Sequence, residues 1–115
     1  MSYIDGFLAP VKTDQREAYT AFVKKTGGLM REYGALSYVE AWGDDVPPGK
    51  VTSMPMAVKA ADDETVVFSW VIWPSKEVRD AGWARMMEDP RMKDVDMPFD
   101  GKRMILGGFT PIAEG

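Results

Sequence analysis

Two carboxylates interrupt apolar stretches of this sequence, and they are the residues best suited to acid–base chemistry. Asp5 lies within YIDGFLAPV (residues 3–11), and Glu40 lies within ALSYVEAW (residues 35–42). A carboxylate among apolar side chains must be paired, hydrogen-bonded, or carry a raised pKa. Two roles are therefore open for each: a structural ion pair, with Arg103 or Lys59 as the partner, or a catalytic acid or base.

Aromatic side chains near these carboxylates are candidates for binding a ligand. Tyr38 and Trp42 alternate with Glu40 along one predicted strand, so the three side chains share a face. We expect them, with Phe22, to line a pocket whose polar group is Glu40 or Asp5. Packing in the core is the alternative role for each ring.

Basic residues near the last predicted strand could hold a small acid. The segment MPFDGKR (residues 97–103) places Lys102 and Arg103 close to Phe99, a combination that suits a carboxylate ligand. With Lys59, these two residues complete the set of expected ligand-binding side chains.

The composition excludes several kinds of chemistry. The chain has no cysteine and no histidine, which removes thiol nucleophiles, imidazole bases and the common zinc and haem ligands. No spacing of acidic residues resembles a calcium loop, and no glycine-rich phosphate loop is present. We therefore expect no metal and no cofactor, so any reaction must rely on carboxylate acid–base work or cofactor-free oxygen chemistry.

Charge and hydropathy restrict the partners and the location. The net charge of −4 does not favour a nucleic-acid partner, since such proteins usually present a basic face. No apolar run approaches the ~20 residues of a membrane helix. Without an export signal or a cysteine, the sequence predicts a cytoplasmic protein.

The hydrophobic patterns predict one α+β domain spanning residues 1–115. A helix should begin near Asp14, capped by a box with Glu17, should be interrupted at Gly27-Gly28, and should end at Gly34. Ser75 should cap a second helix. Strands are expected at 3–11, 35–42, 65–73 and 103–112, with an extended piece at 51–60. This order predicts a ferredoxin-like fold, an antiparallel sheet with two helices on one face.

The strand TVVFSWVIW (residues 65–73) is apolar on both faces. Trp70 and Trp73 fall on opposite faces, so we expect one ring in the core and the other in an interface. An open sheet usually carries polar residues on its uncovered side, and here both sides need cover. The pattern therefore predicts a homodimer that packs sheet against sheet.

Three longer motifs resemble a known family. DVPPGKVTSMPMAVKA (45–60), VVFSWVIWPSKEVRD (66–80) and MMEDPRMK (86–93) are similar to segments of the YbaA-like family of small bacterial proteins, a domain of unknown function. The resemblance extends from YIDGF (3–7) to MPFDGKRMILGGF (97–109). It implies a dimeric α+β barrel and no established activity. More distantly, the implied fold is similar to that of cofactor-free oxygenases, whose pockets use Trp, Tyr and Arg.

Two functions from different classes stay open. The first is a homodimer with a small-molecule pocket between helices and sheet, with acid–base or oxygenase-type chemistry. The second is a non-catalytic dimeric binding or interaction module whose aromatic residues all serve packing. Glu40 separates the two: a raised pKa in a hollow favours the first, and a tight salt bridge in a filled core favours the second.

Overall fold

The structure, a computed structural model, describes residues 2–93 and 95–115; the other two residues of the expected domain lie outside it. Its elements, in chain order, are β1 (Tyr3–Lys12), η1 (Thr13–Gln15), α1 (Arg16–Glu32), β2 (Ser37–Trp42), α2 (Met54–Ala57), β3 (Glu64–Trp73), α3 (Lys76–Glu88), η2 (Pro90–Met92) and β4 (Ile105–Phe109). The four strands form one antiparallel sheet in the order β2-β3-β1-β4. This is the expected ferredoxin-like α+β fold.

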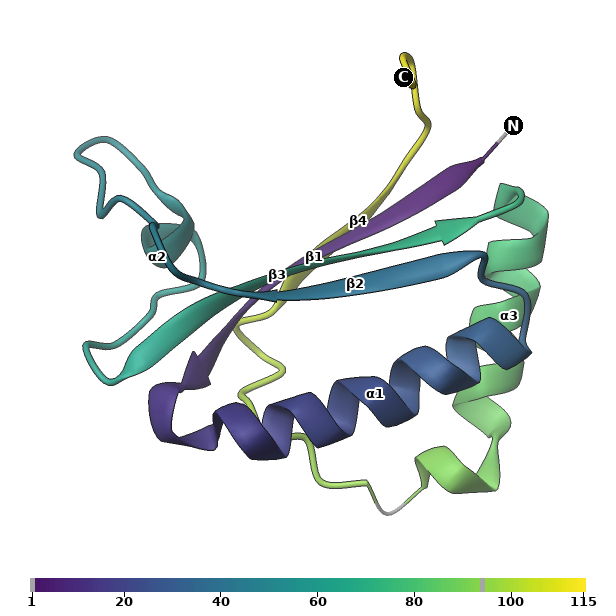
Figure 1. The fold of residues 1–115 in the computed structure, drawn as a ribbon, viewed down its shortest axis with the longest axis horizontal. Coiled ribbons are helices and arrows are strands. Elements are labelled where there is room, and N and C mark those ends of the chain that lie inside the picture. The colour runs from purple at the N-terminus through teal and green to yellow at the C-terminus, as the bar shows by residue number, and fades with distance from the viewer. Residues whose placement is uncertain (1, 94) are drawn as a thin grey trace.

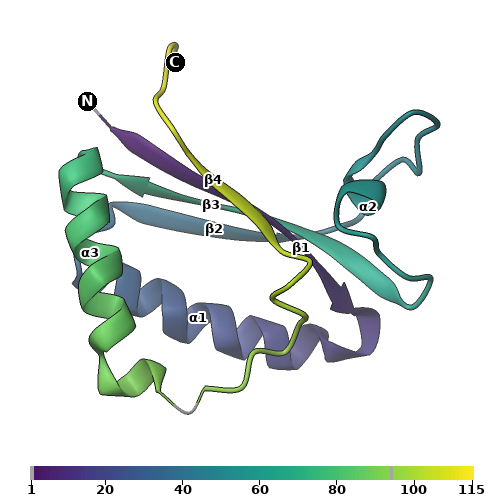
Figure 2. The same cartoon turned by 180° about the vertical axis from the view of Figure 1, so that it is seen from behind.

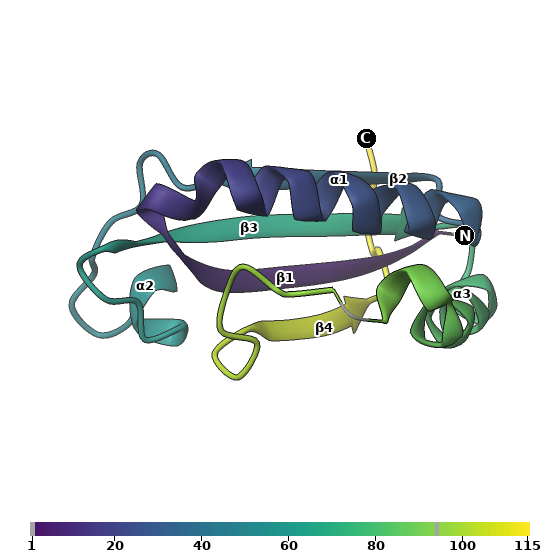
Figure 3. The ribbon, with the colours of Figure 1, turned by 90° about the horizontal axis from the view of Figure 1, so that it is seen from below.

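The two long helices lie on the same side of the open sheet (Figures 1 and 2). Seen from below in Figure 3, α1 runs along β2 and β3, while α3 lies near one end of the sheet. The segment 95–104 passes beneath β1 and so covers the part of the sheet that α1 leaves free. Three pieces of chain, rather than two helices alone, therefore cover the inner face.

The strand register decides which side chains face the helices. Asp5 pairs with Val71, which in turn pairs with Tyr38, so all three lie on the inner face. Glu40 lies on that face as well, opposite Ser69. Trp73, in the same set, is fully buried, which confirms the expected core position for one of the two tryptophans of β3.

The outer face of the sheet is apolar and uncovered in the single chain. Phe68 is 44% exposed and Phe109 is 59% exposed. Trp70 lies on this face next to Phe68, two residues along β3, and it is partly buried. The predicted apolar character of this face is confirmed, and its cover by a second copy of the chain stays a prediction.

The end of α1 is confirmed and its start is not. The N–H of Gly34 donates to the carbonyl of Arg31, and the N–H of Ala35 donates to that of Met30, which is a Schellman motif with Gly34 at φ +118°. At the start, no side chain caps the helix, because the chain first makes the short turn η1. The expected capping box is therefore wrong.

Two other local predictions were also wrong. Helix α1 continues through Gly27-Gly28 instead of breaking there. The glycine at position 27 serves packing, because a Cβ atom there would collide with the ring of Tyr38. The piece 51–60, expected to be extended, contains helix α2. Ser53 caps it by accepting a hydrogen bond from the N–H of Met56, and proline is well tolerated in a first turn.

Among the described residues, no helix is long and apolar enough to cross a membrane.

Candidate functional site

Asp5 is buried at the junction of β1, β3 and α3, where nitrogen donors surround its carboxylate. Its side chain is 2% exposed. Arg79 donates from Nε and Nη2 to Oδ1, at 3.0 and 2.8 Å, and the indoles of Trp73 and Trp83 each donate to Oδ2 at 2.9 Å. The carboxylate therefore has a cation and two neutral donors, which leaves little capacity for a substrate.

The partner of Asp5 corrects an expectation. Arg103 and Lys59 were the expected cations. Instead, Arg79 lies 74 positions along the chain on the inner side of α3, with its side chain only 21% exposed. The sequence did contain a signal for this contact. Ser75 caps α3 by accepting a hydrogen bond from the N–H of Val78, so Arg79 lies one helical turn from the end of β3.

Glu40 lies on the same inner face, and the hydroxyl groups that hydrogen-bond to its carboxylate are neutral. The hydroxyl of Tyr19, from α1, donates to Oε1 at 2.7 Å, and Ser69 lies opposite Glu40 on β3. Burial raises the pKa of Glu40 above its ordinary value and outweighs the hydrogen bonds from Tyr19 and Ser69, which favour the charged form. Burial, followed by the negative charge of Glu40, also raises the pKa of Tyr19. Among the described residues, no ion pair to Glu40 is present.

A cavity of about 170 Å³ lies next to Glu40, between α1, the sheet and the segment 95–104. Its size is close to that of the ~150 Å³ engineered apolar cavity that binds benzene. Its walls are almost entirely apolar, and Glu40, Tyr19, Ser69 and Thr26 are its polar side chains. Five methionines also line it: Met30, Met86, Met92, Met97 and Met104.

Aromatic rings close one side of the cavity. Phe99 makes edge contacts with Tyr19 and Phe22, with ring centroids 5.9 Å apart in both pairs. Trp83 forms another wall while its indole donates to Asp5. Phe22 was expected at the pocket and does line it. Tyr19, Ser69 and Trp83 were not expected, because only the three-dimensional register brings them beside Glu40.

Tyr38 and Trp42 lie outside this cavity, in a groove of about 320 Å³ between α1 and the edge strand β2. The two volumes share three lining residues, Tyr19, Val23 and Glu40. The expected pocket is thus divided in two: Phe22 faces the cavity, Tyr38 and Trp42 face the groove, and Glu40 reaches both.

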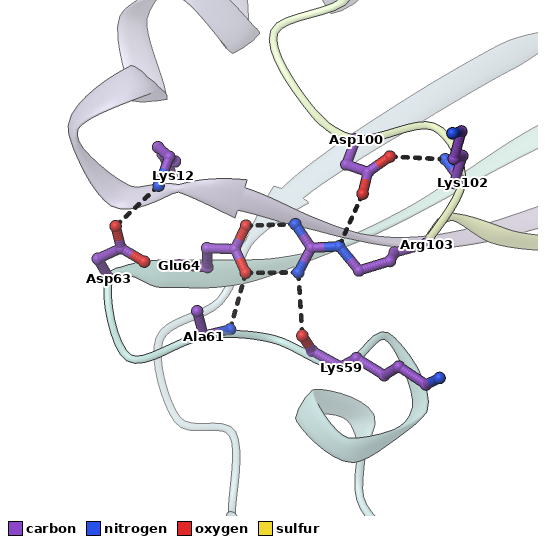
Figure 4. Close-up of polar contacts among 8 residues, drawn as sticks. All are labelled: Lys12, Lys59, Ala61, Asp63, Glu64, Asp100, Lys102 and Arg103. Atoms are coloured by element: carbon purple, nitrogen blue, oxygen red, sulfur yellow. Dashed lines mark hydrogen bonds and ion pairs between the residues drawn. The ribbon is translucent and has the colours of Figure 1, made fainter.

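The three basic residues expected at the site gather at the other end of β3 (Figure 4). Arg103 makes a forked contact with Glu64, at 2.7 Å for each bond, and also donates to Asp100 and to the carbonyl of Lys59. Hydrogen bonding to Arg103 and to the N–H of Ala61 lowers the pKa of Glu64 to about 2. The expected pairing of Arg103 or Lys59 with Asp5 or Glu40 is therefore wrong.

The network around Arg103 has a structural consequence for the cavity. Arg103 ties the end of the segment that carries Phe99 to the start of β3. Lys102 contributes only its backbone N–H, which donates to Asp100, and neither Lys102 nor Lys59 lines the cavity. Ligand binding by these three side chains stays a prediction that the arrangement does not favour.

No cluster of acidic side chains capable of holding a metal ion occurs among residues 2–93 and 95–115. The polar groups at the cavity are one carboxyl and three hydroxyls, which can accept or donate protons. The arrangement can therefore bind a small apolar molecule through one polar contact and exchange a proton with it.

A family model described as a protein of unknown function, DUF1428, matches residues 2–101. A protein described as uncharacterised protein YbaA, from Escherichia coli K12, is 55% identical over 116 residues, with 99% of each chain covered. The protein of the same description from Shigella flexneri matches with the same identity and coverage. These findings confirm the resemblance to the YbaA-like family.

Two solved structures share the fold at low sequence identity. A dimeric ferredoxin-like protein from an uncultured marine organism has a TM-score of 0.63 and 10% identity, with all of both chains covered. The protein Rv0793 from Mycobacterium tuberculosis has a TM-score of 0.50 and 13% identity, covering 99% of this chain and 98% of that one.

Proposed function

We propose that each protomer binds one small, mostly apolar organic molecule in the cavity beneath the helices, and that two protomers form a homodimer. The chain belongs to the DUF1428 family, whose members are described as proteins of unknown function. The observation that carries the proposal is Glu40, a carboxyl with neutral partners at the edge of an apolar hollow. A carboxyl with neutral partners and adjoining space is typical of a site that binds a ligand or transfers a proton.

Acid–base chemistry is the reaction type that this site favours. Burial shifts the pKa of Glu40 upward, towards the pH at which a carboxyl can both take and return a proton. The Tyr19 hydroxyl would hold the carboxylate in place while the substrate occupies the cavity. Oxygen chemistry without a cofactor is a second reaction type compatible with the same apolar space.

The homodimer is supported by the outer face of the sheet. Large apolar side chains, including Phe68, Phe109 and Ile105, are exposed on it. A monomer rarely leaves such a patch open, and a second sheet of the same kind is complementary to it. The fold neighbour from the marine organism is described as dimeric. A cytoplasmic location and the absence of a nucleic-acid partner are parts of the same proposal, resting on composition and charge.

A non-catalytic dimeric module is the second candidate, and one observation favours it. The Tyr19 hydroxyl already satisfies one oxygen of Glu40, so a purely structural hydrogen bond would also explain the pair. In that case the apolar outer face, and not the cavity, would be the functional surface.

Native mass spectrometry of freshly purified protein, beside the denatured mass, tests the proposal. We expect a dimer that carries an additional small mass. Ala9→Leu fills the cavity, because Ala9 is buried and lines it, and should abolish the added mass. Ala18→Leu, on an exposed position of α1, is the matched control and should retain it. A dimer with no added mass that also shows no saturable binding of one-ring compounds would contradict the ligand site, and a monomer would contradict the dimer.

A further inference from the structure

The groove outside the cavity has a different chemical character from the cavity itself. Its α1 side presents Arg16, Thr20 and Lys24, which are four residues apart and so lie on one face of the helix. Its β2 side presents the aromatic rings Tyr38 and Trp42. Two cations and two rings therefore surround a space that adjoins an apolar cavity at Glu40.

Arg16 differs from the arginines that stabilise the fold. Arg79, Arg91 and Arg103 each pair with two carboxylates. Within the part of the chain that the structure describes, Arg16 makes no ion pair, and its guanidinium instead lies 5.5 Å from the centre of the Trp42 ring. Stacking on an aromatic face orients a guanidinium while leaving its N–H edge available.

The surroundings of Arg16 indicate what it can bind. A guanidinium with free N–H groups pairs with a planar carboxylate through two parallel hydrogen bonds. Lys24, two turns further along α1, adds positive charge to the same groove. Glu40 is the acidic side chain that lines the groove, at the boundary with the cavity.

We propose that the groove is the binding site for the carboxylate of the ligand, and that Arg16, held by Trp42, is the residue that binds it. The ligand class is then a small carboxylic acid whose apolar part, about the size of one ring, occupies the cavity. This inference rests on the proposed function and specifies its substrate class.

Glu40 lies between the two halves of such a ligand, which affects its protonation. The groups that face it are Tyr19, Arg16 and Lys24 from α1 and Ser69 from β3. A bound carboxylate brings a second negative charge close to Glu40, and like charges favour the protonated form. Binding should therefore take up a proton, as the dependence of the calorimetric heat on buffer ionisation would show.

Two probes of equal size, phenylacetate and phenylacetamide, separate the carboxylate contribution from that of the ring. Titrations followed by amide NMR at pH 7 should show phenylacetate binding about tenfold more tightly, as expected for one charge-assisted contact at a partly exposed site. Arg16→Gln should bring the two affinities together by weakening phenylacetate alone. Arg31→Gln, an exposed position on the same helix, is the matched control and should keep the preference.

The outcomes distinguish this inference from the function on which it rests. Equal affinity of the two probes for the wild-type protein, or a preference that survives Arg16→Gln, would overturn the carboxylate site and leave the cavity as a binding site for neutral molecules. If neither probe binds, the proposed function and the inference both fail.

Discussion

Asp5 and Glu40 lie on the same face of one sheet, separated by a single strand, and their surroundings differ in kind. Asp5 accepts hydrogen bonds from a guanidinium and two indoles, at a junction where the core is filled. Glu40 has only the hydroxyls of Tyr19 and Ser69 as neutral hydrogen-bond partners among the described residues, and it lies beside a cavity. A buried carboxylate whose oxygens are saturated by a cation serves the fold, whereas one with neutral partners and adjoining space is available to a ligand.

Removing the charge of Asp5 should have the largest effect on stability. We expect Asp5→Asn to lower the free energy of unfolding by about 3 kcal/mol, because Arg79 would keep its place without its main counter-charge. Urea denaturation measures the loss. Asp80→Asn removes the exposed partner of the same arginine and should cost less than about 1 kcal/mol. Equal losses of unfolding free energy in the two variants would mean that Asp5 does not stabilise the fold more than the exposed Asp80 does.

Added volume should also affect the two regions differently. A methyl group at Gly82 would meet the ring of the buried Trp73, at 2.6 Å, and we expect Gly82→Ala to destabilise the protein by about 1–2 kcal/mol. At Gly27 the methyl would meet the ring of Tyr38, which borders the groove and can move, so the cost should be smaller. Thermal denaturation would rank the variants.

The neighbouring glycine supplies the control for both substitutions. A methyl group at Gly28 would meet nothing, so Gly28→Ala should stabilise the helix by about 0.5–1 kcal/mol. If Gly27→Ala were stabilising to the same extent as Gly28→Ala, the close contact between α1 and Tyr38 would be incorrect.

Acid titration should show that Glu64 is a carboxylate that serves the fold. The Arg103 contact lowers the pKa of Glu64 from 4.5 to about 2, so the folded state releases this proton more readily than the unfolded chain does. Its contribution to stability is complete above pH 4.5 and should disappear as the pH falls towards 2. Glu64→Gln should flatten this part of the stability profile, and Asp62→Asn, at an exposed position in the same turn, should leave it unchanged.

Glu40 should show the opposite sign and the smallest effect on stability. Its pKa is raised in the folded protein, so the folded state holds the proton more tightly and loses stability as the pH rises above the usual range of a carboxyl. Glu40→Gln should therefore raise the melting temperature slightly at neutral pH and have no effect near pH 3, measured by calorimetry. A lower melting temperature at neutral pH would place Glu40 with Asp5 as a residue that the fold requires.

Much of the fold could be predicted because strong local patterns agreed with one another. The continuous apolar run of β3 and the Ser75 cap each determine an element without reference to distant residues. Helix α2 was missed because residues 51–60 were expected to be extended, although a proline after a serine cap, as in Ser53-Met54-Pro55, is typical of a first helical turn.

The site was harder to predict, since its partners are distant in sequence. Asp5 and Glu40 were recognised by their apolar surroundings, but neither Arg79 nor Tyr19 stands near them in the chain. Only the strand register and the rotation of each helix decide which side chain meets which carboxylate. The expected cation Arg103 was excluded for the same reason: it lies just before β4 and pairs with Glu64 at the start of β3.

The position of β1 has a consequence for how the protein is made. β1 is the first strand to be synthesised, yet its two neighbours in the sheet are β3 and β4, and β4 is the last strand. An apolar strand therefore leaves the ribosome with no partner, and one of its edges stays open until β4 has been released. The cavity wall at Phe99 comes equally late. Ribosome-bound chains that stop before residue 105 should therefore expose an edge of β1 and engage chaperones.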